Sequence, residues 1–320
     1  MSRFIMLVGL PASGKSSLSA FLKNATGFNI HSSDAIRKEL LGNQRDQTEN
    51  DIVFNTLHKR IKEDLKNGVD TLYDATNISQ KRRIAFLREI ERYDAVKECH
   101  FMATPYDVCI ERDAARENSV GKAVIDKMYK SFSVPQYYEG WDKIAIHWDS
   151  SIVNNLKDIN TFLDPLDDFD QKTPFHKLTL GAHMKEAYSW AVEKLAERDL
   201  KPKEYENLLL AIRLHDIGKP FSQDCSADKE RCTYYQHHLT GAYDSLFYMK
   251  TLHLFKPIIK GYSQRPKRDD EILEIADLIQ NHMRPYQMEQ DSTKKRFVSL
   301  FGEKKYSEIM FIYEADKAAH

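Results

Sequence analysis

The stretch Gly9-Leu10-Pro11-Ala12-Ser13-Gly14-Lys15-Ser16 constrains this chain of 320 residues more than any other. An apolar run, residues 4–8, precedes it, and a segment with helical spacing, residues 17–22, follows it. A strand, a glycine loop with G-x-x-x-x-G-K-[ST] spacing and a helix, in that order, predict a loop that wraps a phosphate group. The glycines let the backbone approach an anion, and the loop amides and the helix N-terminus point towards it.

The loop predicts binding of ATP with Mg²⁺ as cofactors. Lys15 is expected to reach the β- and γ-phosphates, and the Ser16 hydroxyl is expected to bind the Mg²⁺. A chance match in an ordinary turn is the alternative, which the agreement of the loop with both flanking elements disfavours. The residues expected to contact the nucleotide from the loop are Gly9, Ser13, Gly14, Lys15, Ser16 and Ser17.

The bulk properties predict a soluble chain of two domains. A length of 320 residues is large for one compact domain. The net charge of −1 shows no global footprint for nucleic acid, although a local basic groove remains compatible with it. The four cysteines show no close pairing and predict reduced thiols, and no apolar run is long enough to span a bilayer. We therefore expect a cytoplasmic protein with no membrane partner.

In the first half, apolar segments alternate with segments of helical spacing, which predicts an α/β fold with a parallel sheet and flanking helices. Residues 33 and 34 offer caps for the helix that follows the second strand. The expected strands are 4–8, 28–30, 71–73, 98–103 and 143–147, and the later helices are 51–67, 80–92, 107–117 and 123–132.

Two aspartates at expected strand ends, Asp34 and Asp74, should meet the glycine loop, because ligands bind beyond the carboxyl ends of parallel strands. Asp34 either accepts the proton of an attacking hydroxyl or caps a helix. Arg37, on the same helical face, could hold a phosphate of the acceptor. Asp74 could hold Mg²⁺ through a water or orient the acceptor site, and the alternative is an ordinary aspartate of a turn.

Arg112 and Arg116 lie one helical turn apart. Two guanidinium groups on one face suit a lid that closes over ATP phosphates. The alternative is a solvated face on which they pair with Glu111, Asp113 and Glu117.

Residues 1 to about 150 resemble the kinase domain of bacteriophage-type polynucleotide 5′-kinases. By this resemblance, Asp34 is the general base on a 5′-hydroxyl and Arg37 clamps the adjacent 3′-phosphate. Arg116 matches a lid arginine, but Val120 stands where the phage pattern has a further arginine, and Arg112 or Lys122 could replace it. P-loop kinases of small metabolites share several of these pieces. The matching segments are 9–16, Ser33-Asp34 with Arg37, Asp74-Ala75-Thr76-Asn77 with Arg82-Arg83, and Arg112 to Ser131, and they imply Arg37, Asp74, Thr76 and Asn77 as acceptor-binding residues.

The acidic, proline-containing stretch 164–170 reads as a connector. We place the domain boundary near residue 160, which gives domains 1–160 and 161–320. From residue 177 onward the strand patterns vanish and an all-α domain is expected, with helices at 186–198, 204–214, 241–251, 270–281 and 307–320.

The pair His215-Asp216 is the chemical signal of the second half. Adjacent imidazole and carboxylate suit a divalent first-row metal, although alone the pair is a weak signal that a structural role also explains. This half resembles the HD-domain phosphohydrolases, and its text around Asp316 is similar to that of the HD domains of bacterial tRNA-nucleotidyltransferases. The resemblance implies His183, His215, Asp216 and Asp316 as ligands of one metal, with His237 and His282 as ligands of a second.

The resemblance implies one or two divalent ions among Mn, Ni, Co, Fe and Zn. Such an ion lowers the pKa of a water and so supplies a nucleophile for phosphoester hydrolysis. Lys219 either steadies a phosphate oxygen or is a plain surface lysine. His176 and His238 are expected to support the site or lie at the surface rather than to bind metal.

Together the two resemblances imply a bifunctional enzyme that heals nucleic-acid ends. One half phosphorylates 5′-hydroxyl ends with ATP, and the other opens 2′,3′-cyclic phosphates or removes terminal 2′ or 3′ phosphates. Ends of RNA or DNA, RNA first, are the expected partners, with an RNA ligase acting downstream. The alternatives are a kinase of a small metabolite or nucleotide fused to a nucleotide phosphohydrolase, and a binding protein without turnover. The aromatic residues near 137–148 are expected to be core or domain interface rather than a surface that stacks on bases. The short basic runs 294–296 and 265–268 are expected to be solvated faces.

Overall fold

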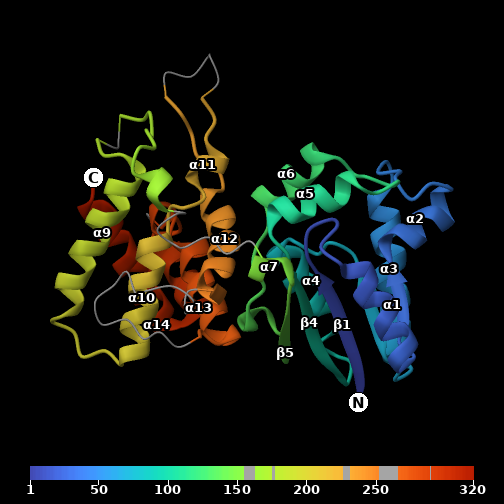
Figure 1. Cartoon of the computed structure of the whole chain (residues 1–320). Coiled ribbons are helices and arrows are strands. Elements are labelled where there is room, and N and C mark those ends of the chain that lie inside the picture. The colour runs from blue at the N-terminus through green and yellow to red at the C-terminus, as the bar shows by residue number, and fades with distance from the viewer. Residues whose placement is uncertain (155–162, 175–176, 226–230, 252–265, 289) are drawn as a thin grey trace. The chain divides into compact units, whose positions relative to one another are not determined.

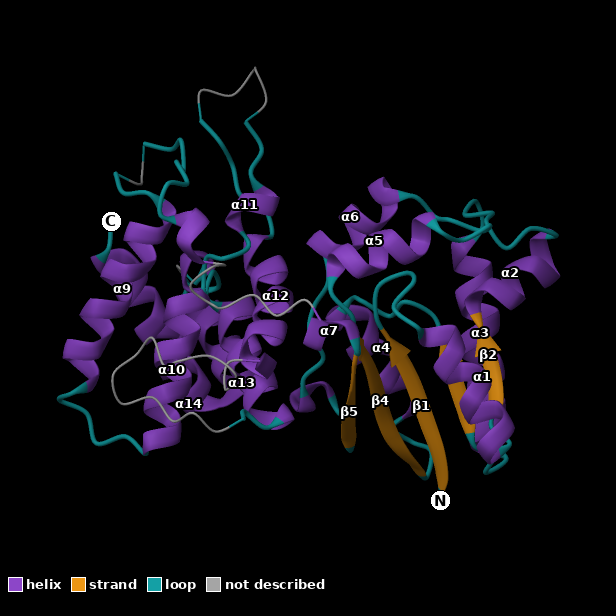
Figure 2. Cartoon of the chain, viewed as in Figure 1, coloured by secondary structure: helices purple, strands orange, loops and turns teal. Residues whose placement is uncertain are grey.

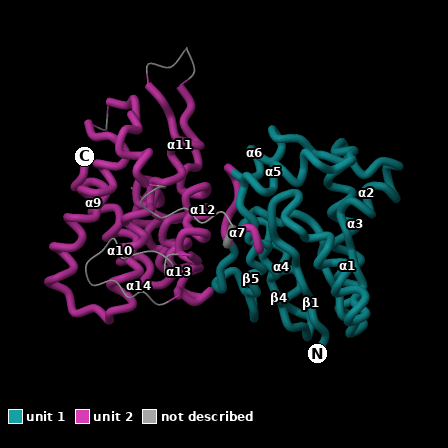
Figure 3. The backbone as a smooth tube through the Cα atoms, in the orientation of Figure 1, with its two compact units in different colours: residues 1–129, 135–149 teal, residues 130–134, 150–320 magenta. Residues whose placement is uncertain are grey.

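A computed structural model describes residues 1–154, 163–174, 177–225, 231–251, 266–288 and 290–320. These divide into two compact units, shown in Figure 3. Unit 1 comprises residues 1–129 and 135–149, and unit 2 comprises residues 130–134 and 150–320. The expected boundary near residue 160 lies outside the described residues.

Unit 1 contains a five-stranded parallel sheet in the order β2-β3-β1-β4-β5 (Figure 2). The central strand β1 has Phe4, Ile5 and Leu7 wholly buried. A strand buried on both faces is characteristic of a parallel sheet covered by helices. The strands are β1 Ser2–Val8, β2 Asn29–Ser32, β3 Thr71–Asp74, β4 Ala95–Ala103 and β5 Lys143–Trp148.

The helices of unit 1 follow the strands in alternation, which is the expected α/β fold (Figure 1). Gly27 and Gly42, both with positive φ, end the first two of them. The helices are α1 Lys15–Thr26, α2 Ser33–Leu41, α3 Asn50–Lys66, α4 Gln80–Ile90, α5 Tyr106–Ala114 and α6 Lys122–Lys130, with the 3-10 turn η1 Tyr137–Glu139.

A buried ion pair joins helix α4 to the turn η1 inside unit 1. Arg83 of α4 donates from Nε and Nη2 to Glu139 of η1, both at 2.7 Å, and both side chains are almost wholly buried. Glu139 also accepts from the Trp141 indole at 3.1 Å. The aromatic cluster near residue 140 therefore serves the interior, as expected, apart from the exposed ring of Tyr137.

Unit 2 contains helices only in its described residues, apart from one isolated antiparallel bridge between Asp224 and Thr233. Its apolar core includes Met184, Leu210, Leu246 and Ile275. The elements are α7 Ser151–Asn154, η2 Asp164–Leu166, α9 Leu180–Leu195, α10 Pro202–Leu214, α11 Lys219–Ser222, α12 His237–Thr251, α13 Asp269–Asn281, η4 Pro285–Gln287 and α14 Asp291–Ala318.

Several element boundaries differ from those expected. The last helix begins at Asp291 rather than 307, because two helical segments join across a kink at Gly302, whose φ is 83°. Ser32 precedes α2 in an extended conformation with no side-chain cap, so the predicted capping by Ser33 or Asp34 is wrong. Asp316 lies inside α14 and is buried, so the end of this helix holds the residue firmly in place.

The expectation of four reduced thiols is wrong for two of them. Cys225 and Cys232 form a disulfide, while Cys99 and Cys109 are free and buried. The Asp224–Thr233 bridge aligns the two segments that carry the disulfide, with both backbone hydrogen bonds at 2.9 Å. Among the described residues, no helix combines the length and apolarity needed to cross a membrane.

Candidate active sites

The glycine loop of unit 1 has the backbone that a phosphate cradle requires. Gly14 has a φ of 96° and directly precedes α1, a conformation that L side chains rarely adopt. A Cβ at Gly9 would lie 2.6 Å from Ser13 Oγ and 3.0 Å from Met102 Cβ, so this position has no room for a side chain. Ser16 and Ser17 are exposed at the start of α1. The loop therefore presents backbone amides and a helix N-terminus to one point.

Lys15 lies buried against the same loop. Its Nζ donates to the carbonyl oxygens of Gly9, at 3.0 Å, and Leu10, at 2.6 Å. Burial lowers the pKa of Lys15 to about 8, against an opposing contribution from the carboxylate of Asp74. The oxygen partners of this buried ammonium are neutral carbonyls, so an anionic phosphate would stabilise its charge more strongly than they do.

Asp34 and Arg37 of α2 form the acceptor side of unit 1. Arg37 Nη1 donates to Asp34 Oδ1 at 3.0 Å, and Nη2 donates to Asn50 Oδ1 at 3.0 Å. The Asp34 side chain is 70% exposed, whereas that of Arg37 is 5% exposed. Arg37 Nε is buried without a hydrogen-bond partner. An exposed carboxylate thus lies next to a buried guanidinium that has a donor to spare, which suits an acceptor carrying an anion.

Asp74 connects this side to the glycine loop. It ends β3, and burial raises the pKa of its carboxyl group, while Lys15 and a hydrogen bond from Ser19 oppose the increase. The charge of Asp34 raises the pKa of Asp74 further, so the two carboxylates and Lys15 act on one another. The structure brings these three predicted residues together, and the role of Asp74 at the acceptor or the Mg²⁺ stays a prediction.

Asn77 and Thr76 support the loop through their contacts with backbone. Asn77 Nδ2 donates to the Leu7 carbonyl at 2.8 Å, and the Thr76 carbonyl accepts from the Gly9 amide at 3.1 Å. Arg83 Nη1 donates to the Asn77 carbonyl at 2.9 Å. The amide of Asn77 is therefore used in holding the strand end, and Arg83 is a buried structural residue.

The two lid candidates differ in their surroundings. Arg112 makes a two-point ion pair with Asp149, at 2.5 and 3.1 Å. Asp149 accepts from Thr104, whose hydroxyl also donates to the Ser13 carbonyl of the loop at 3.1 Å. Arg116 is exposed, and its charge reaches Lys15 and lowers the pKa of that lysine. Arg112 is thus tied to the loop through Asp149, a partner that the helical spacing does not indicate, and the lid role of both arginines stays a prediction.

The segment around Val120 is closed by a buried aspartate. Asp113 accepts from the Ser119 hydroxyl at 2.7 Å and from the Gly121 amide at 3.0 Å. Burial raises the pKa of Asp113, but these hydrogen bonds outweigh it and the net shift is downward. Val120 itself is exposed. Lys122 forms an ion pair at 2.7 Å with Asp126, which lies one turn further along the same helix, α6.

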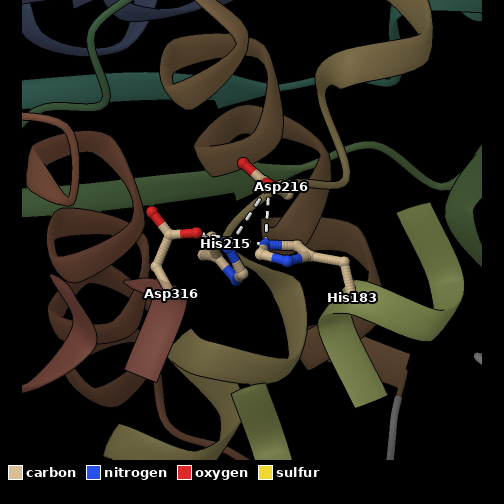
Figure 4. Close-up of side chains that lie close together, drawn as sticks. All are labelled: His183, His215, Asp216 and Asp316. Carbon is tan, nitrogen blue, oxygen red and sulfur yellow. Dashed lines mark ion pairs between the residues drawn. The ribbon is translucent and has the colours of Figure 1, made fainter. Parts of the chain in front are cut away.

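In unit 2, four residues from three distant parts of the sequence meet at one point (Figure 4). They come from α9, the end of α10 and α14. Asp316 Oδ1 lies 3.1 Å from His183 Nε2 and 3.6 Å from His215 Nε2. Asp216 Oδ2 lies 3.3 Å from His215 Nε2 and 3.5 Å from His183 Nε2. All four side chains are buried: His183, His215, Asp216 and Asp316.

A second group shares Asp216 through its other oxygen. Asp216 Oδ1 lies 3.1 Å from His237 Nε2 and 3.6 Å from His282 Nε2. The two imidazole Nε2 atoms lie 3.3 Å apart. Asp216 is therefore placed between two sets of ligand atoms, one on each carboxylate oxygen.

All four histidines are oriented in the same way by backbone carbonyls. Their Nδ1 atoms lie 2.7–3.3 Å from a carbonyl oxygen, so each Nδ1 donates and each Nε2 keeps a lone pair for the centre. The pairs are His183 with Ala319, His215 with Ile212, His237 with Tyr234 and His282 with Ile279.

These residues fit a divalent metal ion. The Nε2 of His215 is buried and has no hydrogen-bond partner. Burial lowers the pKa of His215, but the Asp216 and Asp316 carboxylates outweigh it and raise the pKa to about 10. The two carboxylates therefore favour a positive charge at this centre. Imidazole nitrogens with carboxylate oxygens are a donor set for Zn, Mn, Fe, Co or Ni.

Lys219 is a buried part of this centre and not a surface lysine. Its Nζ lies 2.6 Å from Asp216 Oδ2 and donates to Gln171 Oε1 at 2.8 Å. This contact holds both the lysine and the shared carboxylate in position.

Two family models match separate parts of the chain. Residues 4–135 match the family model described as AAA domain, and residues 180–319 match the family model described as HD domain. The chain carries a P-loop kinase-type domain and an HD domain. Domains of the P-loop kinase type use ATP and HD domains hold divalent metal ions, and the histidine–aspartate groups of unit 2 could bind such an ion.

Curated relatives match about half of the chain. An L-seryl-tRNA(Sec) kinase of Methanococcus maripaludis is 27% identical over 168 residues, which is 49% of this chain and 65% of the relative. The transcription factor bHLH140 of Arabidopsis thaliana is 25% identical over 174 residues, 51% of this chain and 18% of the relative. A solved sugar kinase from Janibacter sp. HTCC2649 covers 46% of this chain and 86% of its own, with 15% identity and a TM-score of 0.36.

Two residues of the HD domain escaped the sequence reasoning. The hydroxyl of Tyr286 donates to Asp316 Oδ2 at 2.7 Å, and His320 Nε2 lies 3.4 Å from Asp316 Oδ1. His320 follows Asp316 by four residues, a helical spacing that could have indicated it, whereas no local pattern indicates Tyr286. The ring of His238 lies beside those of His237 and His282, and His176 is outside the described residues.

Proposed function

We propose that this protein heals broken ends of nucleic acid, RNA foremost. Its kinase domain transfers the γ-phosphate of ATP to a 5′-hydroxyl end. Its HD domain opens a 2′,3′-cyclic phosphate or removes a terminal 2′ or 3′ phosphate. Opening the cyclic phosphate with one water leaves a 2′- or 3′-phosphate, and a second water releases this group as inorganic phosphate and leaves a free diol. A 5′-phosphate and such a processed end are ready for an RNA ligase.

The observation that carries the proposal is the pairing of Asp34 with Arg37. The exposed Asp34 carboxylate can accept the proton of an attacking hydroxyl. The buried Arg37 guanidinium keeps Nε unpaired beside it. An acceptor that satisfies both residues has a hydroxyl and, close to it, an anionic group. The 5′-terminal nucleotide of a polynucleotide has this arrangement, with its hydroxyl and the next phosphate.

In the kinase step, the acceptor oxygen bonds to the γ-phosphorus as its proton passes to Asp34, and ADP leaves. Little covalent help is needed in such transfers, so positioning and charge neutralisation dominate. Lys15 and Arg116 supply positive charge where the phosphates lie, and Ser16 supplies an oxygen for Mg²⁺. The relative named for phosphorylating seryl-tRNA supports an acceptor attached to RNA.

In the hydrolytic step, the two histidine–aspartate groups would hold a divalent ion, which when bound would supply an activated water as the nucleophile. Asp216 and Asp316 would balance the charge of that ion. Lys219, buried 2.6 Å from Asp216, fixes the shared carboxylate and places an ammonium where a phosphate oxygen would bind.

A small phosphorylated metabolite or nucleotide is the second candidate acceptor. The observation that favours it is the net charge of −1, which provides no general attraction for a polyanion. The second candidate also satisfies Asp34 and Arg37, so the acceptors must be compared directly.

One RNA substrate tests both activities. An oligoribonucleotide with a 5′-hydroxyl and a 2′,3′-cyclic phosphate is incubated with ATP and Mg²⁺ or Mn²⁺, and both ends are read. We expect both ends to be converted, with the oligonucleotide a far better acceptor than a nucleoside. Asp34→Ala should abolish only 5′ phosphorylation, and His215→Asn only release of the cyclic phosphate. Asp107→Ala, an exposed aspartate on α5, is the control. Equal use of nucleosides and oligonucleotides would favour the second candidate.

A further inference from the structure

A group of three exposed or half-exposed residues lies beside the metal centre of the HD domain. We call Tyr286, Tyr313 and Lys317 the rim patch. Tyr286 belongs to η4 and is 39% exposed. Its ring lies edge-on to that of Tyr313, with centroids 4.7 Å apart and an interplanar angle of 82°. Lys317 Nζ lies 5.3 Å from the centroid of the Tyr313 ring.

The rim patch is joined directly to the ligand set through Asp316. Oδ1 of this carboxylate faces His183 and His215, whereas Oδ2 accepts from the Tyr286 hydroxyl at 2.7 Å. The Tyr286 side chain therefore contacts the predicted metal ligand Asp316 directly through its hydroxyl group. Tyr286 is thus an exposed ring in direct contact with a carboxylate of the ligand set.

A second cation, Arg284, lies two residues before Tyr286 in the chain. Its guanidinium lies 5.2 Å from the centroid of the Phe301 ring. Exposed aromatic rings interleaved with lysine and arginine are what proteins use to hold single-stranded nucleic acid, by stacking on bases and pairing with phosphates.

We propose that the rim patch binds the last nucleotide of a polynucleotide 3′ end, with its base against Tyr286 and the preceding phosphate near Lys317. This inference rests on the proposed function and specifies the substrate of the HD site. A base attached to the ribose whose phosphate occupies the centre would lie one sugar beyond it, and the Tyr286 ring lies one hydroxyl beyond Asp316. A phosphorylated metabolite without a base gains nothing from this ring.

The first experiment uses the wild-type full chain and two oligoribonucleotides with 2′,3′-cyclic phosphate ends. They are identical except that one lacks the terminal base. We expect KM for the abasic end to be about tenfold higher, which is the usual effect of losing one stacked base. Equal KM values for the two ends would overturn the inference while leaving the proposed function intact. No hydrolysis of either oligonucleotide, with hydrolysis of p-nitrophenyl phosphate, would overturn both.

Variants then separate the ring from the hydroxyl. Tyr286→Leu should raise KM for the end that bears a base about tenfold and leave KM for the abasic end unchanged. Tyr286→Phe keeps the ring, so KM should stay near wild type while kcat falls through the loss of the contact with Asp316. A KM that rises equally for both ends in Tyr286→Leu, or a change in kcat alone, would show a purely structural role and overturn the inference.

Lys317 is tested by the dependence of KM on salt. Lys317→Ala should reduce the slope of log KM against log salt by about one, because one phosphate contact is lost. Lys194→Ala, an exposed lysine on α9, is the matched control and should leave that slope unchanged. Equal slopes for Lys317→Ala and wild type would overturn the assignment of a phosphate to this residue.

Discussion

His237 Nε2 lies 3.1 Å from Asp216 Oδ1, whereas the two histidines of the other group approach Asp216 Oδ2. A carboxylate shared in this way suits two ions. We expect two equivalents of Mn²⁺ to bind per chain and His237→Ala to retain one, because the group with Asp316 keeps all four ligands. Metal content after equilibrium dialysis measures this. His147→Asn, a histidine of unit 1, should retain both, and a single equivalent in the wild type would contradict the two-ion prediction.

Breaking the buried ion pair of Arg83 and Glu139 should strongly lower the stability of the fold. Arg83→Leu leaves the Glu139 carboxylate buried without its cation, and we expect a loss of about 3–5 kcal/mol in the free energy of unfolding. Urea unfolding followed by circular dichroism measures it. The double variant Arg83→Leu/Glu139→Leu should be more stable than Arg83→Leu alone, since no charge is left unpaired. A double variant that is less stable than both single variants would contradict this account.

Asp149 should affect ATP binding through two contacts. It holds Arg112 at two points, and the Thr104 hydroxyl that it accepts from also donates to the Ser13 carbonyl. We expect Asp149→Ala to raise KM for ATP about tenfold, the size of one charge-assisted hydrogen bond, with little change in hydrolysis at the HD site. Initial rates against ATP concentration measure it. Lys62→Ala, which breaks the surface pair with Glu89, should leave KM unchanged.

His100 should make unit 1 less stable in acid. Burial and the neighbouring His147 lower the pKa of His100 to about 4, against the opposing charge of Glu98, while Lys143 adds to the decrease. The unfolded chain, with a histidine pKa of about 6.5, takes up the proton first as pH falls. The contribution of His100 is therefore complete above about pH 6.5 and is lost towards pH 4, at most about 3 kcal/mol.

The prediction for His100 is checked by urea unfolding at pH 7.5, 5.5 and 4.5 with a chelator present. His100→Gln should lose less stability between pH 7.5 and 4.5 than wild type. His58 and His147 also have lowered pKa values and should keep part of the slope in the variant. Identical slopes for variant and wild type would show that His100 does not contribute.

The order of strands and helices could be predicted from the sequence because each element has its own short-range pattern of apolar residues. The glycine loop lies between a buried strand and a helix, and its spacing is short enough to be read directly. The kink at Gly302 joins two helical segments through a glycine, which local periodicity treats as an end. The Cys225–Cys232 disulfide depends on the pairing of Asp224 with Thr233, which no spacing of cysteines reveals.

The candidate sites divide in the same way. His215 and Asp216 stand out as neighbours, but His183 and Asp316 lie 133 residues apart by number and could be joined to them only through a family resemblance. Arg82 and Arg83 look alike in the sequence, yet Arg83 is wholly buried with Glu139 because of tertiary packing. Tyr286 carries no signal of its own, since its importance comes from the position of Asp316.

The five residues 130–134 belong to unit 2, although unit 1 resumes at residue 135. Phe132 is wholly buried, with its ring 4.8 Å from that of Tyr243, and the Val134 amide donates to Gln280 Oε1 at 3.1 Å. A fragment beginning at residue 150 would lack the Phe132 ring and the backbone partner of the Gln280 side chain. One proteolytic cut at the end of unit 1 therefore cannot release unit 2 complete. Inactivity of such a fragment would reflect the missing segment and not its catalytic residues.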